Sequence, residues 1–393
     1  MHSMYIKRIA ESALSKILAG DKVGIVIGAR QVGKTTLVQH SLKGRNATFL
    51  NFDIEIDKQR FLAASVLPPM DALRSFGNPE ILVVDEAQRL PDSARVIKGW
   101  HDAHIPVKIL LLGSSSLDLL NQSAESLTGR NEKLFLPPLL FDEVVTAQSW
   151  YAAEYTPEIM RRNFAAPVRT LLLQSMVFGG YPEAVISDDK LVYLRNLGSD
   201  YLFKDILQTG LIKTPDLIKK LLSLLAHQAG SEVSVNELAT QLHMARPTVE
   251  RYLELLEQTY VIFRLPSFST NPRKEISKSR KVYFWDTGIR NALLNAFSTE
   301  EFRPDIGALW ENWVVAEVAK LNLLQGNKSE LFFWRSRAQS EVDLVIKTGE
   351  SLKAFEIKWH RKHHTNRAFS ELYGVPVQML ESTNPFSLCT SRP

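Results

Sequence analysis

Cysteine is almost missing from this 393-residue chain, in which Cys389 is the only one. A single cysteine excludes an internal disulfide and a cysteine-based metal cluster, so a reducing compartment suits the chain. No apolar run is long enough to cross a bilayer, and residues 1–18 mix charged with apolar side chains where a secretory signal carries an apolar block. We therefore expect a cytoplasmic protein with no membrane partner.

Charge of one sign is also scarce. The 47 Lys and Arg nearly balance 43 Asp and Glu, which leaves a net charge of +4. This balance does not by itself imply a nucleic-acid partner, so the positions of the basic residues matter more. A hydrophobic content of 45% and a charged content of 23% are typical of a folded chain. Because 393 residues exceed what one core usually covers, we predict several domains.

The first 147 residues alternate short β-branched apolar runs with helical patterns. The runs are residues 24–27, 48–52, 81–84 and 108–112. This alternation is typical of an α/β domain with a parallel sheet covered by helices. Residues 148–212 then turn helical around the break Phe178-Gly179-Gly180-Tyr181-Pro182, which predicts a small helical subdomain that serves as a lid.

The second half of the chain predicts two further domains. Residues 213–268 read as three helices and a short strand, with Ser234 and Glu237 in a capping box and Pro247 near the start of the third helix. This spacing favours a winged helix-turn-helix. A polar, basic linker over residues 271–281 leads to an α/β domain that we assign to 269–393. There a helix over 309–323 precedes strands near 331–334, 342–346 and 354–358.

A P-loop pattern directly follows the first apolar run. Gly28 and Gly33 let the backbone curl so that successive N–H groups face a phosphate, which the next helix N-terminus also favours. Lys34 supplies charge between the β- and γ-phosphates, and the Thr35 hydroxyl is suited to Mg²⁺. The alternative is a chance glycine-rich turn, but the strand context argues against it. The predicted nucleotide-binding residues are Gly28, Ala29, Arg30, Gln31, Val32, Gly33, Lys34, Thr35 and Thr36.

Two carboxylates end the apolar run at residues 81–84. Asp85 can orient the water shell of Mg²⁺, and Glu86 can polarise the attacking water. An acidic pair at a strand end could instead cap a helix. Together with the P-loop, the pair predicts binding and hydrolysis of ATP with Mg²⁺.

Later residues resemble ATPases of the AAA type. The run at residues 108–112 ends in Gly113 and Ser114, and Gly129-Arg130 follows some fifteen residues on. The resemblance implies that Ser114 or Ser115 senses the γ-phosphate. It also implies that Arg130 is an arginine finger for a neighbouring subunit's nucleotide. A solvated loop arginine is the alternative interpretation of Arg130.

The third helix of the predicted winged helix carries candidate DNA contacts. Recognition helices approach bases and phosphates with their N-terminal residues, which here include Arg246, Thr248 and Arg251. Glutamates at 250, 254 and 257 would repel phosphate on part of this surface. A packing or protein-docking role is therefore the alternative to DNA binding.

Carboxylates and a lysine gather near the C-terminus. On adjacent strands Asp343 and Glu356 would converge on Mg²⁺, Glu311 fits as a helix-borne carboxylate, and Lys358 shares the face of Glu356. This set resembles the PD-(D/E)XK nuclease core, with Val342 in place of proline. A charged surface strand pair and a catalytically silent nuclease fold are the alternatives.

Basic and aromatic residues follow this cluster. Arg361 and Lys362 lie in the run Trp359-His360-Arg361-Lys362-His363-His364, which suits a phosphate backbone. The histidines could instead bind a transition metal, but the interspersed Lys and Arg argue against that.

The order of these motifs looks like one family. It resembles the prokaryotic AAA-type ATPases with a winged helix and a C-terminal domain, long of unknown function, that is similar to PD-(D/E)XK nucleases. The resemblance implies ATP hydrolysis and a homo-oligomer, since an arginine finger works in trans. We predict an ATPase that acts on DNA, for example branched DNA, and leave nuclease activity open. The alternative is a nucleotide-controlled switch with a silent nuclease fold.

Overall fold

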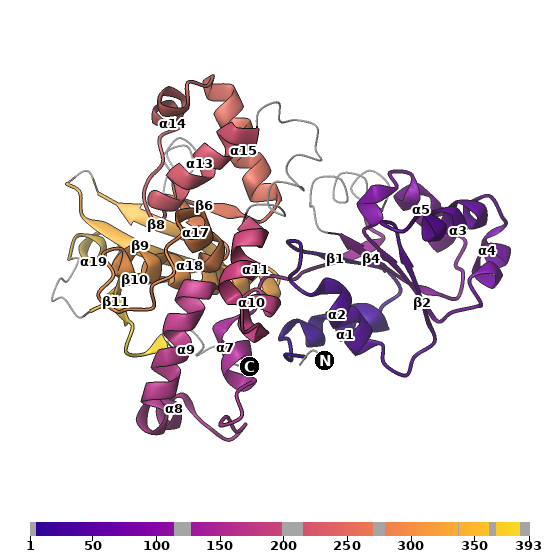
Figure 1. Cartoon of the computed structure of the whole chain (residues 1–393), viewed down its shortest axis with the longest axis horizontal. Helices are drawn as coiled ribbons and strands as arrows, with labels where there is room; N and C mark the ends of the chain where they lie inside the picture. The colour runs from indigo at the N-terminus through magenta and orange to yellow at the C-terminus, as the bar shows by residue number, and fades with distance from the viewer. Residues whose placement is uncertain are drawn as a thin grey trace. The chain divides into compact units, whose positions relative to one another are not determined.

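The computed structural model describes residues 5–113, 127–198, 215–269, 280–336, 338–360 and 367–385. It divides into two compact units, one of Lys7–Pro137 and one of Met1–Ile6 with Pro138–Pro393. Figure 1 shows the first in indigo to purple and most of the second in magenta to yellow. The chain therefore passes between the units twice, after residue 6 and after residue 137.

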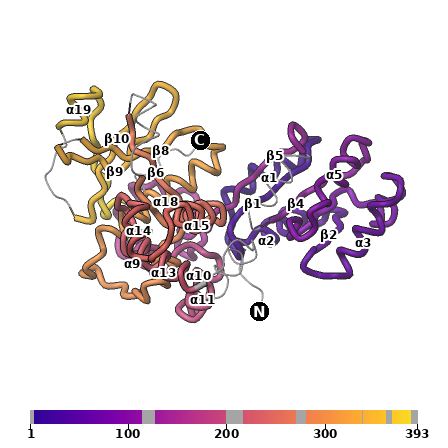
Figure 2. Tube along the Cα trace, turned by 90° about the horizontal axis from the view of Figure 1, so that it is seen from above, coloured from indigo at the N-terminus to yellow at the C-terminus, as the bar shows by residue number. Residues whose placement is uncertain are grey.

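A five-stranded parallel sheet is the centre of the smaller unit. Its strand order is β2-β3-β4-β1-β5, and Figure 2 shows β5 beside β1. Every residue of β1 and β3 is buried, as expected for parallel strands covered on both faces. The four predicted strands are confirmed, and β5 is an addition. The bounds are β1 Val23–Ile27, β2 Ala47–Asn51, β3 Ile81–Asp85, β4 Lys108–Gly113 and β5 Asn131–Phe135.

Helices and an aromatic cluster complete this unit. Phe61 lies edge-on to Phe52 at 5.1 Å between ring centroids and 5.3 Å from Trp100, which also meets Phe76 at 6.0 Å. These rings join α3 and α5 to the end of β2. The helices are α1 Ala10–Ala19, α2 Lys34–Ser41, α3 Glu55–Ser65, α4 Pro69–Ser75, the 3₁₀ helix η1 Ala87–Arg89 and α5 Ser93–Asp102.

The larger unit begins with helices, as predicted. Ser234 caps α14 by accepting a hydrogen bond from the Glu237 N–H at 3.3 Å, which confirms the N-cap of the predicted capping box. The helices of this part are α7 Phe141–Thr146, α8 Pro157–Asn163, α9 Ala165–Phe178, α10 Pro182–Ile186, α11 Lys190–Asn196, α13 Pro215–His227, α14 Val235–Leu242 and α15 Arg246–Gln258.

A two-stranded antiparallel sheet follows α15. Strand β6 (Ile262–Pro266) pairs with β7 (Arg280–Phe284), and α15 packs against β6 (Figure 1). Arg280 and Lys281 thus belong to a strand, so the prediction that they lie in a linker is wrong. The pairing also spans residue 268, where we predict a domain boundary.

The C-terminal part is a four-stranded sheet with a helix on each face. The order is β11-β10-β9-β8, with β10 antiparallel to β9 and parallel to β11. Trp310 and Trp313 of α18 pack in one cluster with Phe333 and Leu344, whereas Phe369 of α19 packs in another. The helix and three strands predicted here are confirmed. The bounds are α17 Thr287–Leu294, α18 Ile306–Leu324, β8 Glu330–Arg335, β9 Glu341–Thr348, β10 Ser351–Lys358, α19 Arg367–Tyr373 and β11 Val377–Glu381.

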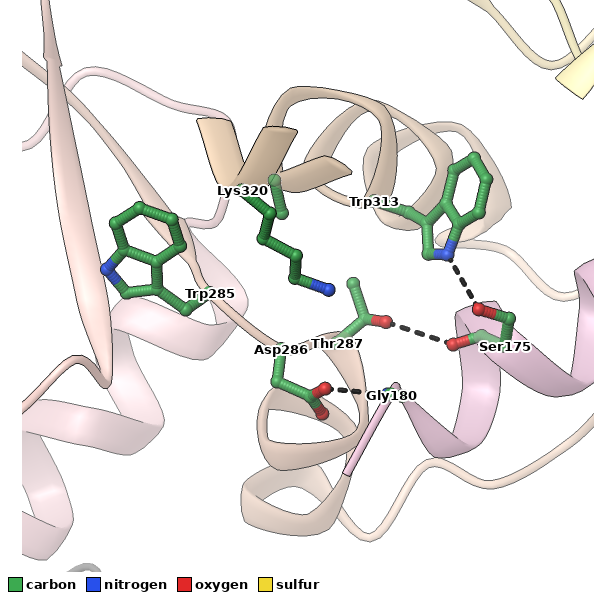
Figure 3. A pocket seen from close by; sticks show the side chains of 9 residues that line it. Ser175, Gly180, Trp285, Asp286, Thr287, Trp313 and Lys320 are labelled. Atoms are coloured by element: carbon green, nitrogen blue, oxygen red, sulfur yellow. Dashed lines mark hydrogen bonds between the residues drawn. The ribbon is translucent and has the colours of Figure 1, made fainter. Parts of the chain in front are cut away.

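The Phe-Gly-Gly-Tyr-Pro break forms a tight polar junction around Asp286 (Figure 3). The Asp286 carboxylate accepts hydrogen bonds from the N–H of Gly180 at 2.7 Å and of Ile289 at 3.2 Å. Gly179 has φ 74°, and a Cβ there would lie 1.9 Å from Asp286 Oδ1, so glycine is required. Burial raises the pKa of Asp286, while Lys320 and the backbone donors oppose that rise. The break is thus a packing junction between α9, α10 and α17.

A second charged contact, between the partly buried Asp305 and two buried arginines, joins α17 to the start of α18. Asp305 accepts hydrogen bonds from Arg290 Nη1 at 2.5 Å and from Arg303 Nε at 2.6 Å. Burial opposes ionisation of Asp305, but hydrogen bonds from Arg303 and Arg290 outweigh it and lower the pKa to about 2. A lowered carboxyl pKa stabilises the fold above the unfolded pKa, and this stability is lost as the pH falls towards the folded pKa.

Replacing Asp305 with Asn should therefore reduce stability at neutral pH. We expect the free energy of unfolding to fall by about 2 kcal/mol at pH 7, since each pKa unit is worth about 1.4 kcal/mol. The deficit should shrink as the pH is lowered from about 4 to the folded pKa of about 2. Urea denaturation over this pH range measures it. Asp188→Asn, at an exposed position, is the control, and an equal loss in both variants would contradict the assignment.

Candidate functional site

The P-loop connects β1 to α2. Gly33 has φ 91°, a left-handed conformation that glycine adopts without strain, and it directly precedes α2. At Gly28 an added Cβ would lie 2.2 Å from the Leu136 carbonyl oxygen, so a side chain is excluded. The loop thus curls at the N-terminus of a helix, where backbone N–H groups favour an anion.

The ammonium group of Lys34 lies over this loop. Lys34 is 6% exposed, and its Nζ donates hydrogen bonds to the carbonyl oxygens of Gly28 at 3.0 Å and Ala29 at 2.9 Å. The loop therefore surrounds a positive charge, which is the group that a triphosphate needs there.

Thr35 and Asp85 are in contact at the carboxyl end of the parallel strands. The Thr35 hydroxyl, in the first turn of α2, donates a hydrogen bond to Asp85 Oδ2 at 2.6 Å, and the Glu86 N–H donates to Asp85 Oδ1 at 2.9 Å. A hydroxyl and a carboxylate next to a phosphate-binding loop are oxygen ligands of the kind Mg²⁺ prefers. These residues fit the metal that the P-loop implies.

Glu86 lies immediately beyond β3, with φ 52° at the start of η1. Burial raises the pKa of Glu86, Lys34 opposes the rise, and Asp85 adds to it. Gln88 Nε2 donates a hydrogen bond to Glu86 Oε2 at 2.5 Å, which orients the carboxylate. A partly buried carboxylate with a raised pKa is suited to accept a proton from water.

Arg8 is a functional residue that the sequence analysis did not identify. Its guanidinium is buried and donates to the carbonyl oxygens of Val32 at 2.9 Å and Pro137 at 2.6 Å. It thereby holds the P-loop to the segment where the chain leaves this unit. No motif marks Arg8, because its partners lie 24 and 129 residues away.

Arg130 lies at the amino end of the parallel strands, whereas the P-loop lies at their carboxyl end. It precedes β5, and Asn131 pairs with Val23 at the start of β1, whereas the P-loop follows the end of β1. The length of β1 therefore separates it from Lys34, about 13 Å along the strand. Its Nε donates to Asp102 Oδ1 at 2.6 Å. Arg130 is thus placed away from the nucleotide site of its own chain.

The predicted DNA-contacting residues of α15 lie in its first turns. Arg246 and Arg251 are exposed and Thr248 is partly buried. Arg246 Nε pairs with Glu250 Oε1 at 3.2 Å. Ser114, Arg361 and Lys362, which we also predict as site residues, lie outside the described residues.

The C-terminal candidates do come together. Asp343 Oδ2 accepts from the Ile357 N–H at 2.7 Å and from Lys358 Nζ at 3.3 Å, and Lys358 also pairs with Glu356 at 3.4 Å. Glu311 Oε1 lies 3.0 Å from the ammonium of Lys281. Four predicted residues therefore share one cluster, which Lys281, Tyr283 and Glu341 complete.

These C-terminal carboxylates do not fit a metal ion. Within the described ranges, no group of three or more His, Cys, Asp or Glu side chains is placed to hold one. The ammonium of Lys281 lies against Glu311, Glu341 and Asp343 instead. We therefore derive no metal-dependent step from this cluster.

Comparison with known proteins decides the family. The uncharacterized proteins Rv2008c of Mycobacterium tuberculosis and Mb2031c of Mycobacterium bovis are each 30% identical to the chain over 360 residues, which cover 90% of this chain and 74% of theirs. The chain belongs to their family. MJ1544 of Methanocaldococcus jannaschii, also uncharacterized, is 27% identical over 378 residues, covering 93% of this chain and 81% of that protein.

Domain matches agree with this family assignment. An AAA domain matches residues 20–145, and two domains of unknown function, DUF8612 and DUF4143, match residues 169–300 and 306–391. A solved structure, the Walker-type ATPase paby2304 of Pyrococcus abyssi, superposes with a TM-score of 0.53 at 16% identity, over 74% of this chain and 96% of that one. The family thus has an AAA-type P-loop ATPase fold.

None of the helices in the described residues is both long and apolar enough to span a membrane.

Two substitutions should separate nucleotide binding from turnover. Lys34→Ala should weaken binding of ATP with Mg²⁺ by about 10²-fold, because it removes a charge-assisted contact to phosphate. Glu86→Gln should preserve binding but slow turnover by about 10²- to 10⁴-fold. Calorimetric titration and phosphate release measure these effects. Lys43→Ala and Glu80→Gln, both at exposed positions, are matched controls, and normal turnover by Glu86→Gln would refute its role as the base.

Proposed function

We propose that the chain hydrolyses ATP and uses the reaction to act on DNA. The observation that carries the ATPase part is the hydrogen bond between Thr35 and Asp85 beside Lys34. It brings two sequence motifs that are 50 residues apart into one oxygen-lined site at the end of a parallel sheet.

Each residue of the site has one role in this proposal. The backbone N–H groups of residues 28–33 hold the phosphates, and Lys34 neutralises charge between the β- and γ-phosphates. Mg²⁺, held through Thr35 and Asp85, supplies further charge neutralisation when bound. Glu86 accepts the proton of the attacking water. Ser114 is proposed to contact the γ-phosphate.

Arg130 is proposed to act on a neighbouring subunit. Its position at the far edge of the sheet supports this role, because a guanidinium there could reach a nucleotide only on another copy of the chain. The proposal therefore requires a homo-oligomer in which one subunit's Arg130 faces the next subunit's P-loop. Its pair with Asp102 is half-exposed, so breaking it costs little.

Mixing two inactive variants tests action in trans. Arg130→Ala and Lys34→Ala should each be inactive alone, since one lacks the finger and the other the P-loop charge. Mixed subunits should regain turnover, because a Lys34→Ala subunit still offers Arg130 to an intact P-loop. Phosphate release measured across mixing ratios shows the recovery. Asp102→Asn is the control, and a loss equal to that of Arg130→Ala with no recovery on mixing would show that the ion pair is merely structural.

The helices α13 to α15 are proposed to bind DNA as a winged helix over residues 213–268. Three helices followed by β6, which pairs with β7 beyond residue 268, support this interpretation. The exposed Arg246 and Arg251 at the start of α15 would contact phosphates or bases, with Thr248 beside them. Arg361 and Lys362 are proposed to add phosphate contacts from the C-terminal domain at 269–393.

ATP turnover measured against DNA tests this half of the proposal. We expect stimulation by at least one of single-stranded, duplex, forked or four-way DNA. Substituting both Arg246 and Arg251 with Ala should reduce the affinity for that DNA by about tenfold or more while leaving turnover without DNA unchanged. Arg161 and Arg162, two exposed arginines of α8, give the control double substitution. Turnover that is indifferent to every DNA form would refute action on DNA.

A nucleotide-controlled switch is the second candidate function. The observation that favours it is the pairing of Arg246 with Glu250, which partly neutralises the surface proposed for DNA. In a switch, the domains at 148–212 and 213–268 would respond to bound nucleotide. The C-terminal domain, in which Asp343 and Glu356 lie on the adjacent strands β9 and β10, would be a silent nuclease fold that recruits a partner. Slow turnover unaffected by DNA is the result that distinguishes it.

A further inference from the structure

The ammonium group of Lys281 is surrounded by three carboxylates from two other elements. Lys281 lies on β7 and is 3% exposed. Its Nζ is 3.0 Å from Glu311 Oε1 of α18 and 3.9 Å from Asp343 Oδ1 of β9. It also forms an ion pair with Glu341 Oε1, which lies on β9 as well. One buried cation thus serves three anions.

The surroundings of this cation are closed on the side of Glu311, whereas Glu341 is partly exposed and its Oε2 also lies 3.7 Å from Arg335 Nε. The Tyr283 hydroxyl donates to Glu311 Oε1 at 2.8 Å, and the Phe333 ring centroid lies 5.6 Å from Lys281 Nζ. Gly230 lies against Glu311, because a Cβ there would be 3.3 Å from Glu311 Oε1. Packing therefore holds the carboxylates in place around the ammonium.

The opposite side of Asp343 is also engaged. Its Oδ2 accepts from the backbone N–H of Ile357 at 2.7 Å and from Lys358 Nζ at 3.3 Å. On the other oxygen, Asp343 Oδ1 lies 3.9 Å from the ammonium of Lys281, which is an ion-pair distance. The ammonium groups of Lys281 and Lys358 thus lie next to different oxygens of Asp343.

The electrostatics explain why a cation is needed here. Buried carboxylates repel each other unless a positive charge lies between them. Burial of Lys281 disfavours its charged form, but Glu311, Asp343 and Glu341 outweigh burial and raise the pKa of its amino group. The pKa of Lys358 is likewise raised against burial by Asp343 and Glu356. Both amino groups are thus charged at neutral pH.

We propose that Lys281 is a built-in substitute for a divalent cation in the C-terminal cluster. Carboxylate oxygens are the ligands that Mg²⁺ and Mn²⁺ prefer, and the ammonium of Lys281 lies among three carboxylates where such a cation would lie. The wild-type cluster therefore binds no divalent metal. The carboxylates are not placed to hold a metal ion as they stand, and removing the ammonium leaves a charge deficit that a divalent cation fills as they close around it. The inference does not depend on ATP hydrolysis or on DNA.

Lys281→Met tests the proposal, since it removes the charge and keeps most of the side-chain length. Mn²⁺ titrated into nucleotide-free protein, and followed by electron paramagnetic resonance, should reveal one site in the variant that is about tenfold or more tighter than any in the wild type. Adding Glu341→Gln to the variant should weaken that site. Lys347, which lies on β9 as Glu341 does, forms an ion pair with Glu330 at 2.9 Å on the surface. Lys347→Met is therefore the matched control and should gain no site.

Stability gives a second measurement. Lys281→Met should melt at a lower temperature than the wild type in EDTA and recover with Mn²⁺, whereas wild type and Lys347→Met should respond to neither. A folded Lys281→Met protein that gains no Mn²⁺ site overturns the proposal. If Lys281→Met folds neither in EDTA nor with Mn²⁺, Mn²⁺ binding is compared between the wild type and Glu341→Gln. Equal Mn²⁺ binding by these two supports the proposal, and binding that is lost in Glu341→Gln overturns it.

Discussion

The parallel direction of all five strands in the smaller unit is the constraint on which its site depends. Because β1, β3 and β4 end at the same edge, the loop after β1 and the carboxylates after β3 meet there, although β4 lies between the two strands. Thr35 and Asp85 are therefore 2.6 Å apart without any direct pairing of β1 with β3. Under the same constraint, Arg130 lies at the opposite end of the strands. The sheet therefore separates the residues of the chain's own nucleotide site from the residue proposed to act on a neighbouring subunit.

Buried charges have a different role in the larger unit, where they fix contacts between distant parts of the chain. Glu317 of α18 accepts a hydrogen bond at 2.8 Å from the Phe141 N–H, 176 residues away, and pairs with Lys320 at 2.9 Å. Asp286 accepts a hydrogen bond from the Gly180 N–H, and Lys281 joins β7 to α18 and β9. A buried charge without its partner is costly, so each of these groups favours one arrangement of its elements over others.

The sequence predicted what local patterns encode. The buried strands of the parallel sheet and the P-loop are contiguous, so their residues alone identify them. Strand β5 was missed because only Leu134 of its five residues is buried, which leaves a polar pattern. Lys281 was read as part of a basic linker, because its carboxylate partners lie 30 to 62 residues further on and only the folded chain brings them near. The prediction of a metal site identified carboxylates that do cluster in the structure. The sequence does not show that Lys281 lies between them.

The position of Arg8 connects the phosphate-binding loop to the end of the smaller unit. Its side chain donates hydrogen bonds to the carbonyl oxygens of Val32 and Pro137. Arg8 is the second residue of the smaller unit, and Pro137 is its last. The two ends of the smaller unit are thus joined through one guanidinium. A change in the conformation of the loop would therefore disturb the hydrogen bonds that join the two ends of its own unit, so the loop and the termini of that unit share the same few atoms.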